Sequence, residues 1–154
     1  SITKMSAGDA FNVIPETVSL GGTVRSLQPQ TQDLLEARIG ETVAGIASAH
    51  GCTAETNYIR GYPVTMNHPE AVERYERIAR DCLGPDVVLP LADPVMGGED
   101  FSFYGQRVPA CFFFLGLLEE GETHMPGLHN AHFDFNDEAI STGIELFCHL
   151  ALDV

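Results

Sequence analysis

Residues 127–140 read GLHNAHFDFNDEAI and place two histidines in a short polar segment directly before an expected helix. Asn136 is a good cap for that helix, because its side-chain oxygen can accept a hydrogen bond from an unpaired amide of the first turn. The apolar positions that follow keep helical spacing to the end of a predicted helix over 136–152. His129 and His132 are therefore expected in a loop held against a rigid helix start.

Upstream of this stretch, the sequence predicts helices alternating with strands. A helix capped by Asn67 ends at Gly84, and a short buried strand follows over 87–91. Residues 94–104 are expected to form a loop that enters a short helical turn. Residues 110–117 are apolar without alternation, which is typical of a strand buried on both faces of an α/β sheet.

The first 62 residues have a different expected order, β-β-α-β. The expected strands lie at 2–5, 18–25 and 52–60, and the expected helix begins at Pro29 and ends before Gly51. Neither this part nor residues 63–154 looks complete as an independent fold. The predicted fold class is therefore α/β, in an incomplete arrangement of two domains that meet after Tyr62.

Composition and charge exclude several classes of function. The chain has 154 residues, 44% of them apolar, and a formal net charge of −14. Such apolar content argues against general disorder. The acidic balance argues against nucleic acid and against an anionic membrane surface as partners, because both would repel the chain.

The four cysteines are widely spaced and form no Cys-x-x-Cys pair. Cys52, Cys111 and Cys148 lie in apolar runs or beside element ends, so we expect buried free thiols rather than disulfides. The chain opens without a signal peptide, and no apolar run reaches the length of a membrane span. These features favour a cytoplasmic setting.

His129 is the first candidate site residue. Neutral imidazole is a common ligand for zinc, manganese and similar ions, and a loop histidine before a helix is well placed to bind one. The alternative is a surface histidine that forms local hydrogen bonds. His132, three residues later, is interpreted as structural.

A second group follows a pair of glycines. Gly98 would let the backbone approach a ligand closely, and Glu99 could orient a metal-bound histidine through a hydrogen bond. The alternative for Glu99 is an acidic residue in the first turn of a helix.

Arg25 and Asn12 belong to the first 62 residues. Arg25 is expected on a strand face lined by small residues, with room to bind a carboxylate through two hydrogen bonds. An exposed and merely solvated arginine is the alternative. Asn12 stands in an Asn-x-x-Pro turn, where a local side-chain bond to the backbone is the ordinary interpretation.

Taken together, four segments resemble the C-terminal half of the amidohydrolase, carboxypeptidase and aminoacylase family of metallopeptidases. They are, in order, GDAFNVIP at 8–15, GTVR at 22–25, MGGEDFSFY at 96–104, and LHN at 128–130 running into FDFNDE at 133–138. The branch they resemble contains hippurate hydrolases and auxin-conjugate hydrolases, which act on N-acyl amino acids.

The resemblance implies a two-domain enzyme. Residues 1–62 would be the last part of a ferredoxin-like lid domain that forms a homodimer, and residues 63–154 the returning part of an α/β metal-binding catalytic domain. Asn12 and Arg25 would bind the substrate's polarised carbonyl and its carboxylate, together with Gly98. His129 would be a ligand of a site for two divalent metal ions, zinc or manganese, and Glu99 would support it.

The resemblance also implies that the remaining metal ligands and the general-base glutamate lie in an N-terminal half that this chain lacks. No catalytic residue is therefore assigned here, and we expect a fragment that is inactive alone. Two alternatives stay open at this point, a non-catalytic dimerisation module and a degenerate relative that binds small carboxylates without hydrolysis.

Overall fold

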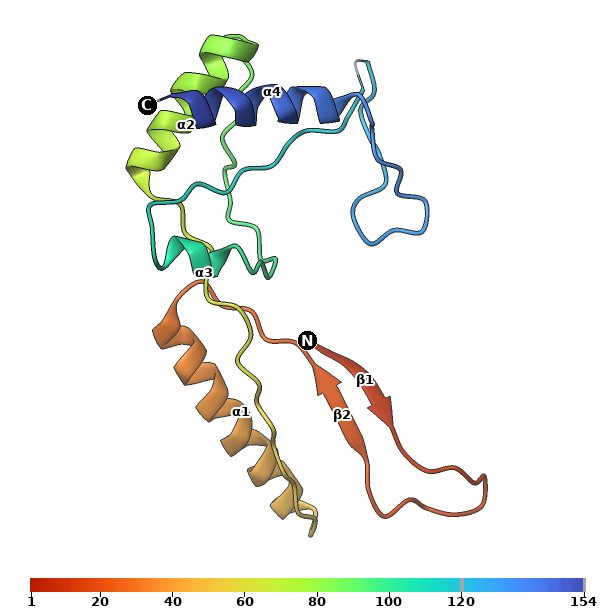
Figure 1. The fold of residues 1–154 in the computed structure, drawn as a ribbon. Coiled ribbons are helices and arrows are strands. Elements are labelled where there is room, and N and C mark those ends of the chain that lie inside the picture. Colours follow the sequence, from red (N-terminus) through yellow and green to blue (C-terminus); the bar gives the residue numbers. More distant parts are fainter. Residues whose placement is uncertain (120, 154) are drawn as a thin grey trace. The chain divides into compact units, whose positions relative to one another are not determined.

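The computed structural model describes residues 1–119 and 121–153. The chain divides into two compact units (Figure 1). Unit 1 comprises Ser1–Val64 and Val95–Gly98, and unit 2 comprises Thr65–Pro94 and the described residues from Glu99 onward. The expected division after Tyr62 into a lid and a catalytic part stays a prediction.

Unit 1 contains a two-stranded antiparallel sheet and one long helix. Strand β1, Ile2–Ser6, pairs with β2, Ser19–Gly22, in a register that places Ser6 opposite Ser19. Helix α1, Pro29–Ala49, starts with proline, whose missing amide costs nothing at a helix start. It is followed by Gly51, whose φ of 68° favours glycine. The predictions for these three elements are confirmed, although β2 is shorter than expected.

Unit 2 contains α2, Pro69–Leu83, α3, Ser102–Gly105, and α4, Ala139–Leu152. Ile78 and Ala79 of α2 and Leu146 of α4 are buried together and form its core. Tyr75 packs against this core and stacks on Phe113, with 4.5 Å between ring centroids. The amphipathic pattern of α2 thus predicts the face that it buries.

Three of the expected strands, 52–60, 87–91 and 110–117, run without regular secondary structure. A strand needs a neighbour to pair its backbone groups, and the one sheet in the described part of the chain is β1 with β2. The described residues are mostly helical with that small sheet, so the expected α/β sheet does not form among them.

Side chains replace the missing strand partner at 110–112. The Asn67 amide donates to the carbonyl of Phe112 at 2.8 Å and accepts from its N–H at 2.7 Å. His68 Nδ1 accepts from the N–H of Ala110 at 3.1 Å. Asn67 therefore does not cap α2, and the residue at the cap position is His68.

Helix α4 also starts differently from the prediction. It begins at Ala139 rather than 136, and the cap residue Glu138 makes no side-chain cap bond. Asn136 instead accepts from the N–H of Glu138 at 3.0 Å and donates to the carbonyl of Leu117 at 3.3 Å. Its side chain thus organises the turn that leads into the helix.

Arg60 fastens the extended segment 52–60 to α1. Its guanidinium lies 2.7 Å from Asp33 and also bonds to Glu36. Both carboxylates raise the pKa of Arg60 above its ordinary value, the Glu36 bond contributing most. The contact is a surface one, so it fixes the course of the segment more than it stabilises the fold.

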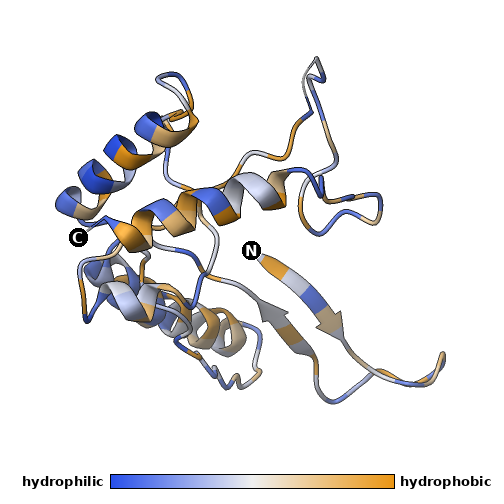
Figure 2. Cartoon of the chain, turned by 45° about the horizontal axis from the view of Figure 1, so that its top comes forward, coloured by the Kyte–Doolittle hydropathy of each residue, from blue (hydrophilic) through white to orange (hydrophobic). Residues whose placement is uncertain are grey.

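The described chain exposes far more surface than its mass predicts. Its accessible area is 12832 Å², whereas a folded monomer of 16.7 kDa would expose about 7,600 Å². Two separate domains of half that mass would still expose only about 9,200 Å². No residue of α1 is buried, and its Leu34, Val43 and Ile46 are exposed. Figure 2 marks the apolar positions of the strands and helices in orange.

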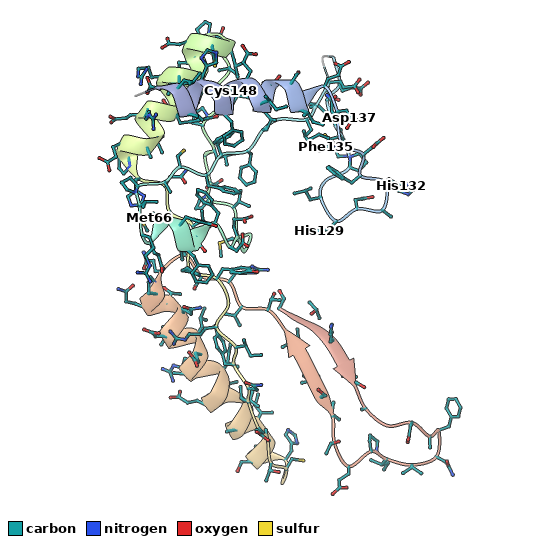
Figure 3. All side chains as sticks on the ribbon, viewed as in Figure 1. Met66, His129, His132, Phe135, Asp137 and Cys148 are labelled. Atoms are coloured by element: carbon teal, nitrogen blue, oxygen red, sulfur yellow. The ribbon has the colours of Figure 1, made fainter. Side chains whose placement is uncertain are left out.

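All four cysteines are free, as predicted. Their expected burial is wrong for two of them, because Cys52 and Cys148 are exposed; Figure 3 labels Cys148 on α4. Cys111 is half-buried, and burial raises the pKa of its thiol. No helix in the described residues is long and apolar enough to cross a membrane.

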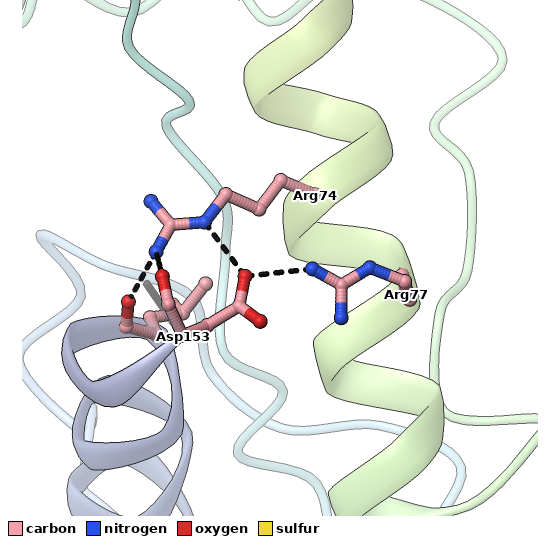
Figure 4. A network of polar contacts seen from close by, with 4 residues as sticks. Arg74, Arg77 and Asp153 are labelled. Atoms are coloured by element: carbon pink, nitrogen blue, oxygen red, sulfur yellow. Dashed lines mark hydrogen bonds and ion pairs between the residues drawn. The ribbon is translucent and has the colours of Figure 1, made fainter.

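The end of α4 is tied to α2 by two arginines (Figure 4). Arg77 contacts the Asp153 carboxylate at 2.6 Å and Arg74 contacts it at 3.0 Å. Arg74 also donates to the carbonyls of Leu150, at 2.8 Å, and of Asp153, and so satisfies groups that a helix end leaves unpaired. The two guanidinium groups, Arg77 first, lower the pKa of the Asp153 carboxyl.

This network predicts an acid-sensitive contact in unit 2. Because the pKa of Asp153 is lower in the folded state, its stabilisation is present above the unfolded pKa of about 4 and is lost as pH falls below it. Asp153→Asn should lower Tm by a few degrees at most at pH 6. The difference from wild type should shrink as pH falls below the unfolded pKa and through the lower folded pKa. Thermal unfolding followed by circular dichroism tests this, with the exposed Glu145→Gln as control, and a difference that is as large at pH 3 as at pH 6 would contradict it.

Candidate active-site residues

His129 lies on an exposed loop before α4, together with His132 (Figure 3). Hydrogen bonds of Asn130 shape this loop: its N–H donates to Gly127 at 3.2 Å, and its side chain accepts from the N–H of His132 at 2.9 Å. These bonds fix the backbone and leave both imidazoles exposed.

The backbone of His129 is strained. Its φ is 67°, and among the described residues it is the one non-glycine residue with a positive φ. This conformation is unfavourable for a residue with a Cβ and persists at functional positions where the surroundings impose it. The prediction of a specific role for His129 therefore gains an observation that the sequence did not contain.

A complete metal site is not present in the described part of the chain. No group of three or more His, Cys, Asp or Glu residues lies close enough together there to hold an ion. Catalytic metals such as zinc usually take about three protein ligands. The described residues alone thus do not supply the three ligands that such a site needs.

Glu99 lies in the turn that leads into α3, whose cap residue is Phe101. The carbonyl of Glu99 accepts from the buried hydroxyl of Ser102 at 2.6 Å, which anchors the helical turn. Its carboxylate accepts from the N–H of Phe101 at 3.5 Å, a long contact. Glu99 does not lie in the first turn of α3, so the expected alternative of a first-turn acidic residue is not what the structure shows. Its expected support of a metal-bound histidine stays a prediction.

Arg25 and Gly98 are the predicted site residues that the structure brings together, both in unit 1. Arg25 Nη1 lies 2.6 Å from the position that a Cβ on Gly98 would occupy, and a ring carbon of Tyr62 lies 3.5 Å from it. The expected strand position of Arg25 is wrong, because β2 ends at Gly22. Arg25 is exposed, and none of the ion pairs among the described residues includes it.

Tyr62 was not predicted from the sequence as a site residue; there it marks only the end of residues 1–62. Its place beside Gly98 follows from the return of Val95–Gly98 to unit 1. Asn12 lies elsewhere in unit 1, in the exposed turn between β1 and β2. Glu99 and His129 belong to unit 2.

Unit 2 also has an open hollow at the start of α4, with a volume of about 510 Å³. Its lining comes from the apolar segment and the helix start: Leu115, Gly116, Asn136, Glu138, Ala139, Ser141 and Thr142. None of the predicted site residues is among them.

Comparison with known proteins identifies a family. A sequence profile described as peptidase family M20/M25/M40 matches residues 6–153. The putative amidohydrolase YhaA of Bacillus subtilis is 36% identical over 95% of this chain and 37% of its own length. Hippurate hydrolase of Campylobacter jejuni is 33% identical over 99% of this chain and 38% of its own length. IAA-amino acid hydrolase ILR1-like 4 of Arabidopsis thaliana is 32% identical over 98% of this chain and 35% of its own length.

One solved structure is similar over almost the whole chain. It is the YXEP protein of Bacillus subtilis, described as a dinuclear metal binding peptidase from the M20 family. The TM-score is 0.78 and the sequence identity 28%, over 98% of this chain and 40% of that one. The chain therefore spans well under half the length of the relatives that it matches.

Proposed function

We propose that this chain, which belongs to peptidase family M20/M25/M40, is the C-terminal part of a metal-dependent hydrolase. The complete enzyme would cleave the amide bond of N-acyl amino acids. Hippurate hydrolase and the IAA-amino acid hydrolase, both similar to this chain, have names that support this substrate class. Because the chain spans 35–38% of these relatives, the activity proposed is that of a larger protein.

The observation that supports the proposal most is the strained backbone of His129. A surface histidine without a role could relax, or be replaced by glycine or asparagine, at no loss. A metal ligand must instead keep its imidazole at one place, whatever backbone angle that requires.

The roles of the other residues follow from their chemistry. His129 would be one ligand of a pair of divalent ions, zinc or manganese, and Glu99 would orient it. The other ligands and a general-base glutamate would come from the part of the relatives that this chain does not cover. The description of YXEP as a dinuclear metal-binding protein supports the pair of ions. When bound, they would supply activated water for amide hydrolysis.

The substrate would be held by unit 1. Arg25 presents an exposed guanidinium that can bind the carboxylate of the amino-acid portion with two hydrogen bonds. Asn12 would bind the scissile carbonyl oxygen, and Gly98 would lie beside Arg25. Positioning of this kind can supply much of the rate enhancement, because it removes the entropy cost of bringing the reactants together.

The large exposed apolar surface supports partners for this chain. Its accessible surface exceeds the area expected for its mass by several thousand Å². This excess is larger than the area that one standard protein interface buries. We assign this surface to two partners: the remainder of the enzyme, and a second copy bound through residues 1–62.

Reconstitution tests the proposal. The purified chain alone should not hydrolyse N-acyl amino acids, with or without added zinc or manganese, because His129 is the one residue of this chain to which the proposal gives the role of metal ligand. Mixing it with a separately produced N-terminal part of the same protein should generate metal-dependent amine release. Metal-dependent turnover by the chain alone would show that the ligands are misassigned. An inactive mixture in which the two parts form a stable metal-loaded complex would favour the non-catalytic alternatives.

A further inference from the structure

We propose that Gly98 is a positioning residue for Arg25, and that its missing side chain sets the preference of the site for substrates with a free carboxylate. The inference rests on the proposed function, in which Arg25 binds that carboxylate. It adds a reason why position 98 must be glycine, and that reason is space for a guanidinium group rather than access of the backbone to the substrate.

The contact distances carry the inference. Arg25 Nη1 lies 2.6 Å from the ideal Cβ position of residue 98, and Arg25 Cζ lies 3.8 Å from it. Real Cβ atoms essentially never approach another heavy atom within 3.0 Å. A ring carbon of Tyr62 stands at 3.5 Å, which is ordinary van der Waals contact. The space beside Gly98 is thus already filled by the guanidinium, with an aromatic ring next to it.

Backbone conformation does not explain the glycine. Among the described residues, the glycines with positive φ are Gly8, Gly51, Gly84 and Gly121. Gly98 is not one of them, so alanine could adopt its backbone angles without the usual penalty. Its neighbour Gly97 has no such contact, since the nearest atom to a Cβ there is Val95 Cγ1 at 3.8 Å. The steric requirement is therefore specific to position 98.

A methyl group at position 98 should displace Arg25 and leave the fold intact. The clashing atom is the far end of a long flexible side chain, which can rotate away at little cost. Bidentate binding of a carboxylate, however, depends on the orientation of the planar guanidinium. A displaced guanidinium would keep its charge but lose the paired geometry, so affinity for the carboxylate should fall less than on removal of Arg25.

Steady-state kinetics on the complete enzyme can isolate this effect. The substrates are an N-acyl amino acid and the matching carboxamide, which lacks the negative charge. Gly98→Ala should raise KM for the acid by about tenfold, the loss of one of two charge-assisted bonds, while leaving kcat and the carboxamide kinetics nearly unchanged. Gly97→Ala is the matched control and should stay within about twofold of wild type, because its Cβ would meet only Val95 Cγ1, at an ordinary van der Waals distance.

The double variant Arg25→Ala/Gly98→Ala decides whether Gly98 acts through Arg25. Once Arg25 is truncated, the clash is gone, so the double variant should have the KM of Arg25→Ala alone. A further rise in KM in the double variant would overturn the inference. So would an unchanged KM in Gly98→Ala when Arg25→Ala raises it.

The same set of variants separates this inference from the proposed function. If Arg25→Ala leaves the KM for the acid unchanged, Arg25 does not bind the carboxylate, and the proposed function of this residue fails together with the inference. Circular dichroism shows whether Gly98→Ala folds. Should it not fold, the comparison of Arg25→Ala with the double variant, in which no clash exists, still supports the inference if the KM values are equal and overturns it if they differ.

Discussion

Replacing His129 by glycine should lower kcat/KM of the complete enzyme by about a thousandfold or more. A metal ion contributes several kcal/mol of transition-state stabilisation, and each 1.36 kcal/mol corresponds to tenfold in rate. Removing a ligand should therefore remove most of this contribution. Glycine is the replacement of choice because it adopts the φ of 67° without strain, so that the loss reports on the imidazole rather than on a distorted loop.

Metal content provides the second measurement. Elemental analysis of the purified variant should find less than the full complement of bound ions, and excess zinc or manganese should restore little activity. His132→Gly is the matched control, because His132 is exposed on the same loop; it should retain metal and stay within a few-fold of wild-type activity. A His129→Gly enzyme that keeps both its ions and its turnover would contradict the assignment of His129 as a ligand.

The local elements were predictable because their signals are local. Prolines at the starts of α1 and α2 and glycines after their ends specify those helices within a few residues. The family was predictable for a different reason. Four short motifs in the right order restrict the possibilities far more than any one of them, and the family profile over residues 6–153 confirms that identification.

The strands at 52–60, 87–91 and 110–117 were not predictable, because a strand exists only with a partner. Their composition favours strands, but no neighbouring strand pairs with them in the described residues, and they run without regular secondary structure. Asn67 shows the same effect at one residue. Its sequence context indicates a helix cap, yet its amide is used by the backbone of Phe112, a contact 45 positions away.

The sequence predicted which residues belong to the candidate site but not how they are arranged in space. The sequence singles out Arg25 and Gly98 separately, but only the structure places the guanidinium against the glycine. Likewise the loop position of His129 follows from its polar neighbours, whereas the strain in its backbone does not. Contacts between distant residues, such as that of Tyr62 with Gly98, leave no signal in a single sequence.

Arg25→Ala is expected to cause the second large loss of kcat/KM, through weaker substrate binding. The substrate carboxylate is held in the ground state and in the transition state alike, so its loss should mainly raise KM and change kcat less. Losing a bidentate charge-assisted pair should cost about 2–4 kcal/mol, or about 30- to 1,000-fold in kcat/KM. Arg25 is exposed in this chain. The extent to which the bound substrate and Arg25 are buried together would therefore determine where in that range the loss of kcat/KM falls.

Asn12→Ala should give the opposite kinetic signature. If its amide stabilises charge that develops on the carbonyl oxygen, kcat falls more than KM rises. Arg38→Ala serves as the control for a general loss of positive charge, because its one ion pair within the described residues is with Glu41 of the same helix, α1, and 71% of its side chain is accessible. Steady-state kinetics of the three variants with N-acyl amino acids separates the roles. If Arg25→Ala behaves like Arg38→Ala, then Arg25 is a solvated surface residue, and the substrate carboxylate is bound elsewhere.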